Sequence, residues 1–190
     1  YKIFGSVPTD PMHSVRKGVM ARAMSLIFEC MTASQKYRLD ELAQSFHKGH
    51  QQSARKNFPQ TDFSNGVTNL SIMTASEECG LVFLLICLAQ FDDGWDLLND
   101  ALVTKGHKTN LSEVLEALEA LSCFDAWSRI DKFWKLSQQG KYAMEAKQSL
   151  AQMLTMIRDC LPWHTGNGWK LPSFHNTMHI VSDMCKYGKP

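Results

Sequence analysis

The first clear helix of this chain begins in the stretch VPTDPMHSVRKGV, residues 7–19. Asp10 stands where a side chain caps a helix N-terminus, and Pro11 follows at the first helical position, where its missing N–H costs nothing. Apolar residues then recur at helical spacing, which predicts a helix over about 10–31. The first turn also places an acid and an imidazole, Asp10 and His13, three residues apart and within reach of each other.

The Asp10–His13 pair has two interpretations. In the first, Asp10 is only the N-cap of the helix and His13 is an incidental exposed residue. In the second, the pair lies beside a metal ion or faces a nucleic acid. The positive end of the helix dipole favours a carboxylate at this position in either case, so the pattern alone leaves both interpretations open.

Outward from this helix, apolar periodicity predicts six more helices, over about 35–52, 74–91, 95–103, 110–134, 142–160 and 173–186. Thr74 and Asn110 each precede a Glu by three residues, the spacing of a capping box. The helix that Thr74 opens is apolar nearly all round, so we expect it to be central. The predicted fold is therefore mainly α, a bundle of about seven helices with one possible short strand over residues 1–5.

The composition is that of a globular chain, with 44% hydrophobic and 21% charged residues. The longest apolar run, residues 81–89, is far shorter than the ~20 residues that a membrane span needs, so no membrane segment is expected. None of the six cysteines forms a C-x-x-C pair, and most fall at apolar helical positions. This pattern predicts free, buried thiols in a reducing compartment.

Charge is segregated along the chain. Residues 1–60 carry a net charge of +5, residues 61–130 carry −8 and residues 131–190 carry +4. Two basic ends of this kind suit a nucleic-acid surface, although ordinary solvated helix faces give the same pattern. The candidate DNA-binding residues in these ends are Arg16, Lys17, Arg55, Lys56 and His175.

Two further patterns carry weaker signals for metal binding. His175 and His179 have the i, i+4 spacing of zinc ligands on a helix, but Asn176 stands where the usual Glu would be, and spacing identifies no third ligand. The acidic pairs Glu77-Glu78 and Asp92-Asp93 have local explanations as a capping-box acid and as residues that end a helix. We therefore predict no metal site from these residues alone.

Three stretches taken together resemble eukaryotic cut-and-paste DNA transposases, in particular the CACTA type and related fungal and algal types. The first is DPMH at 10–13. The second is FSNG at 63–66 with MTASEECG at 73–80, and the third is WKLPSFHNTMH at 169–179, with Tyr187-Gly188 after it. Their order and spacing span nearly the whole chain.

This resemblance implies an RNase H-like core in which three acids hold two divalent metal ions, Mg or Mn, that drive in-line attack on DNA phosphates. It also implies a three-part division: residues 1–34 as an edge of that core, 35–165 as a helical insertion domain, and 166–190 as a return helix to the core. Asp10 and His13 match the D-x-x-H motif of the family, which is accessory to the three metal acids.

The ends of the chain, Tyr1 and Pro190, do not look like the ends of a protein, so we expect a piece of a longer one. The missing acids would lie on either side, and the fragment alone would be inactive and hold no cofactor. The full-length protein would be nuclear, would bind DNA and would form a homo-oligomer. The alternative is a helical protein-interaction module without catalytic activity. The transposase interpretation predicts that the helices starting at Asp10 and Ser173 pack side by side.

Overall fold

The computed structural model describes residues 9–50, 66–104, 110–128, 139–161, 163 and 166–187. Within these ranges the chain is helical and contains no strand, which confirms the mainly α class. The strand predicted at residues 1–5 lies outside the described residues.

The described part consists of one π-helix, one short 3-10 helix and eight α-helices. In chain order they are η1 (Met12–Met20), α1 (Ala21–Cys30), α2 (Ala33–His50), η2 (Leu70–Ile72), α3 (Ala75–Leu88), α4 (Asp92–Thr104), α5 (Leu111–Ser128), α6 (Gln139–Cys160), α7 (Pro172–Thr177) and α8 (Ile180–Tyr187).

The opening helix runs from η1 into α1 without a break, so its predicted extent is confirmed. Its first nine residues are π-helical, with hydrogen bonds that reach back five residues, as from the Ala21 N–H to the Arg16 carbonyl. Val15, Val19 and Ala23 recur every four residues, which is close to one turn of either helix type. The apolar pattern therefore predicts a helix but cannot distinguish its type.

The predicted caps of the later helices are confirmed. The Thr74 side chain accepts a hydrogen bond from the Glu77 N–H, and the Glu77 carboxylate accepts one from the Thr74 N–H, which completes a capping box at α3. The Asn110 side chain accepts a hydrogen bond from the Glu113 N–H at 2.9 Å at the start of α5. These caps depend on residues three apart, so the local sequence determines them.

Several helix boundaries differ from the prediction. α4 begins at Asp92, because Asp92 and Asp93 occupy its first turn, where the helix dipole favours acids. The helix predicted over 173–186 is two helices, α7 and α8. The Met178 and His179 N–H groups bond carbonyls only three residues back, and this tighter turn separates them.

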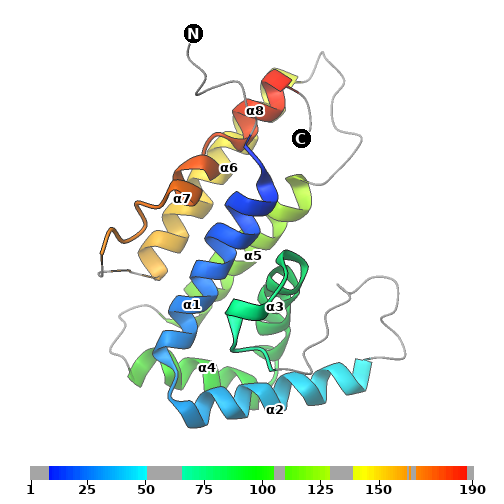
Figure 1. Cartoon of the computed structure of the whole chain (residues 1–190), viewed down its shortest axis with the longest axis vertical. Coiled ribbons are helices and arrows are strands. Elements are labelled where there is room, and N and C mark those ends of the chain that lie inside the picture. Colours follow the sequence, from blue (N-terminus) through cyan, green and yellow to red (C-terminus); the bar gives the residue numbers. More distant parts are fainter. Residues whose placement is uncertain are drawn as a thin grey trace.

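Three rods, the opening helix, α5 and α6, run along the length of the molecule, while α2 and α4 lie across one end (Figure 1). α3 packs against both η1 and α5, and its side chains Leu81, Val82, Leu84 and Leu85 are buried. The central position predicted for this helix is therefore confirmed.

One hydrophobic core joins side chains from all three predicted parts of the chain, from Val15 in η1 through Leu121 in α5 to Ile180 in α8. The three-part division itself stays a prediction. The six cysteines all lie among the described residues and form no disulfide, and of them Cys30 and Cys160 are buried. The expectation of buried thiols is wrong for the two exposed ones, Cys123 and Cys185, because they lie on the outer faces of their helices.

Candidate functional site

The Asp10–His13 pair lies at the solvent-exposed start of the opening helix. The Asp10 carboxylate accepts hydrogen bonds from the Met12 N–H at 2.8 Å and from His13 Nδ1 at 2.5 Å, and its carbonyl accepts one from the Ser14 N–H. The bond from His13 lowers the pKa of Asp10 below its ordinary value. Asp10 is thus the cap that the sequence predicted, and it also holds the imidazole.

The start of the opening helix is attached to the last helix of the chain. The Thr9 N–H and Oγ1 both donate to Asp183 Oδ2 in α8, at 2.9 and 2.6 Å. Further along η1, Gly18 packs so tightly on α7 that an added Cβ would lie 2.5 Å from Ser173 Cβ. The predicted side-by-side packing of the helices that start at Asp10 and Ser173 is confirmed.

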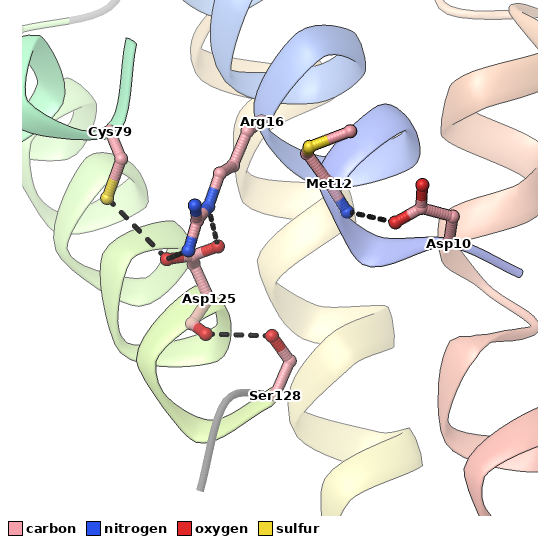
Figure 2. Close-up of polar contacts among 6 residues, drawn as sticks. All are labelled: Asp10, Met12, Arg16, Cys79, Asp125 and Ser128. Carbon is pink, nitrogen blue, oxygen red and sulfur yellow. Dashed lines mark hydrogen bonds and ion pairs between the residues drawn. The ribbon is translucent and has the colours of Figure 1, made fainter. Parts of the chain in front are cut away.

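Arg16 points into the bundle rather than away from it. Its Nε and Nη2 donate to the two carboxylate oxygens of Asp125 in α5 at 2.7 and 3.2 Å, while Cys79 Sγ lies 3.5 Å from the same carboxylate (Figure 2). Ser128 Oγ donates to the Asp125 carbonyl. The Asp125 side chain is 1% exposed and that of Arg16 is 15% exposed, and the bond to Asp125 raises the pKa of Arg16.

Lys17 makes the second link of this kind. Its Nζ lies 3.0 Å from Glu78 Oε1 in α3 and also donates to the Met73 carbonyl. The Glu78 side chain is only 3% exposed, and its Oε2 has no hydrogen-bond partner among the described residues. Burial raises the pKa of Glu78, and the bond from Lys17 only partly opposes this effect. Both predicted DNA-binding residues of η1 therefore hold buried acids, and their contact with DNA stays a prediction.

His175 and His179 come together although the helix between them is interrupted. Their Nε2 atoms are 3.2 Å apart and their rings meet edge to face, both exposed to solvent. At this distance one Nε2 carries a hydrogen and donates it, while the other Nε2 carries none and accepts. Within the described ranges, no group of three or more His, Cys, Asp or Glu side chains gathers where a metal ion could bind.

Two of the predicted DNA-binding residues, Arg55 and Lys56, lie outside the described residues. Sequence reasoning missed Asp125, the partner of Arg16. Its signal was present: an acid on the apolar face of a helix, between Phe124 and the buried Ser128. A buried carboxylate requires a cation or several donors, so this position predicts a partner without identifying it.

No protein-family model matches the chain, no curated protein matches it, and no solved structure matches it. Among the residues that the structure describes, no helix has both the length and the apolar character to cross a membrane.

Proposed function

We propose that this chain is the helical part of a cut-and-paste DNA transposase, together with two flanking pieces of its catalytic core. The observation that supports this best is the contact between the chain's first and last helices. Gly18 packs on Ser173, and Thr9 is hydrogen-bonded to Asp183, so the two segments that resemble core motifs are neighbours. A chain that leaves a core and returns to it needs this adjacency.

In this proposal Asp10 and His13 position the start of a core helix. The described residues do not fit a two-metal centre, since Asp10 is a single carboxylate already bonded to the Met12 N–H and to His13, and no third acid or imidazole joins them. The Mg or Mn ions of such a transposase would need acids outside these residues. DNA cleavage and strand transfer would belong to the full-length, oligomeric, nuclear protein, and this part would bind DNA.

The test is binding of a fluorescently labelled DNA duplex by the purified chain across a range of salt concentrations. We expect the logarithm of the association constant to fall linearly with the logarithm of salt, by about 0.9 for each phosphate neutralised. A Glu116→Lys variant, on an exposed position of the acidic middle, is the control and should change the affinity less than about twofold if DNA lies on the basic ends. No binding at low salt, or a flat salt dependence, would contradict the proposal.

The second candidate is a helical protein-interaction module. It is favoured by an open groove of about 430 Å³ between α5 and α6, whose lining is mostly apolar and includes Phe124, Trp127 and Met153. Apolar grooves of this kind accept amphipathic helices from partner proteins. A chain that binds no DNA at low salt would favour this second candidate.

A further inference from the structure

A second, larger groove lies where the end of α6, the loop over residues 166–171 and α7 meet, with a volume of about 960 Å³. Among the described residues, its lining includes the cationic side chains Arg158 and Lys170, together with His175, and no acidic one. Arg158 is paired with Asp159 at 2.8 Å, but both side chains are exposed, and such surface pairs are weak. The described lining of the groove is therefore basic.

The same groove has an aromatic wall. Trp169 is buried, and its Nε1 donates to the Leu161 carbonyl, which fixes the ring. The Trp163 ring meets it edge to face, with ring centroids 5.9 Å apart, and the Phe174 ring is tilted against it at a centroid distance of 5.3 Å. The Arg22 guanidinium lies 3.7 Å from the centroid of the Trp163 ring and covers one of its faces. Several contacts thus hold these rings in place before any ligand arrives.

The backbone conformation of the loop over residues 166–171 also depends on a glycine. Gly168 has a φ of +55°, a conformation that other residues rarely adopt, and a Cβ there would lie 2.7 Å from the Trp163 carbonyl. The loop can therefore approach Trp163 only with a glycine at this position. The groove is a preformed feature, with its cations and its rings on one surface.

Cations beside aromatic rings, without acids, match a ligand that carries both phosphates and flat rings. Single-stranded nucleic acid has this chemistry, because its bases are free to stack while its backbone follows a basic groove. A DNA duplex matches less well, because its bases already stack on one another. An acidic peptide also matches less well, because it has no bases that could stack on the rings. The volume is that of a site for a drug-sized molecule, which limits the occupant to a short stretch of one strand.

We propose that this groove binds single-stranded DNA, with Arg158 and Lys170 on the phosphates and the rings of Trp163 and Phe174 against the bases. This inference rests on the proposed function, since DNA rather than RNA follows from it. It adds to the transposase proposal the form of DNA that is bound, a single strand, and the groove that binds it.

The test measures anisotropy of a labelled oligothymidine of about a dozen nucleotides, a length within the range that single-strand modules cover. Lys170→Glu combined with Arg158→Glu should weaken binding at least about tenfold at low salt, because it replaces two attractive charges by repulsive ones. Lys147→Glu, an equally exposed charge reversal on α6 outside the groove, is the matched control and should change the affinity less than about twofold.

Stacking is tested separately by Trp163→Leu, which should weaken binding by about 5- to 100-fold. Because Trp163 also packs on Trp169, circular dichroism must show that this variant keeps its helix content. The charge-reversal variant, whose changes are on the surface, keeps the proposal falsifiable if the Trp163 variant does not fold.

The outcomes separate this inference from the proposed function. Salt-dependent duplex binding with equal affinity for the single strand, unchanged in both groove variants, overturns the inference and leaves the function standing. Preference for an RNA strand of the same sequence, or for a poly-glutamate peptide, by more than about tenfold overturns the DNA assignment. If neither strand nor duplex binds, both proposals fail.

Discussion

Arg16 and Lys170 are both basic residues near the start of a helical segment, but they have opposite surroundings. Arg16 is bonded through two nitrogens to Asp125, an acid 109 positions away in sequence and buried in α5. Lys170 is exposed on a groove whose described lining contains no acid. A charge that is neutralised inside the fold stabilises the fold, whereas one left in water without a counter-charge can act on a ligand. Only the partners, and not the local sequence, distinguish the two.

Asp125→Ala is the strongest test of this contrast. The variant leaves the Arg16 guanidinium largely buried without a carboxylate, so the free energy of unfolding should fall by about 3–5 kcal/mol. Urea denaturation followed by circular dichroism measures it. The double variant Arg16→Met with Asp125→Leu should recover most of the loss, because it removes both charges together. A loss below about 1 kcal/mol in the single variant would show that the pair is not a buried link.

Gly18→Ala tests the packing of the opening helix on α7. The added Cβ would lie 2.5 Å from Ser173 Cβ, so we expect a loss of about 1–3 kcal/mol in the free energy of unfolding, although alanine is the better helix former.

Two variants serve as controls for Gly18. No atom of the described residues lies within 4 Å of a Cβ built at Gly140 in α6, so Gly140→Ala should be neutral or slightly stabilising. Adding Ser173→Gly to Gly18→Ala should restore part of the loss, because it removes the atom that clashes. Equal effects of the Gly18 and Gly140 variants would refute the close contact.

Glu78 allows a test by pH. Burial raises its pKa in the folded protein above the unfolded value of 4.5, so the folded state keeps a proton where the unfolded state has lost it. The stability that this site contributes is therefore fully present below the unfolded pKa and is lost as the pH rises through the folded pKa. The wild type minus Glu78→Gln difference in unfolding free energy should fall from about pH 4 to pH 8. A difference that rises over this range would mean that the bond from Lys17 lowers the pKa of Glu78 more than burial raises it.

Arg158→Ala should have the smallest effect on stability. Its pair with Asp159 is exposed on both sides, so the midpoint of urea denaturation should stay within error of the wild-type value. Measured beside Asp125→Ala, this variant compares an exposed ion pair with a buried one. A clear fall in the denaturation midpoint would place Arg158 among the structural charges.

Much of the fold follows from local sequence. Asp10, Thr74 and Asn110 were predicted as caps because a cap and its N–H partner lie within three residues of each other. The extent of the opening helix and the central place of α3 followed from apolar spacing. The π-helical turns and the interruption at Met178 did not follow from it. The same apolar spacing fits a π-helix or an α-helix, and one continuous helix or two.

The candidate site was less predictable. The His175–His179 contact follows from the i, i+4 spacing, so the sequence contained it. The pairing of Arg16 with Asp125 joins segments that are far apart in the chain, and no local pattern encodes it. The loop before α7 is recognisably rich in aromatic and turn residues. Which of its side chains share a groove with Arg158 depends on how the loop folds back on α6.

The hydrogen bonds between Thr9 and Asp183 have a consequence for the order of folding. They close a loop of 174 residues, and for an unfolded chain the length-dependent part of this closure costs about 4.6 kcal/mol. Two hydrogen bonds do not offset such a cost. The Thr9–Asp183 contact therefore forms only after the helices between these residues have packed and brought them together. By the same reasoning it opens first when the protein unfolds, and it can release the start of the opening helix while the bundle remains folded.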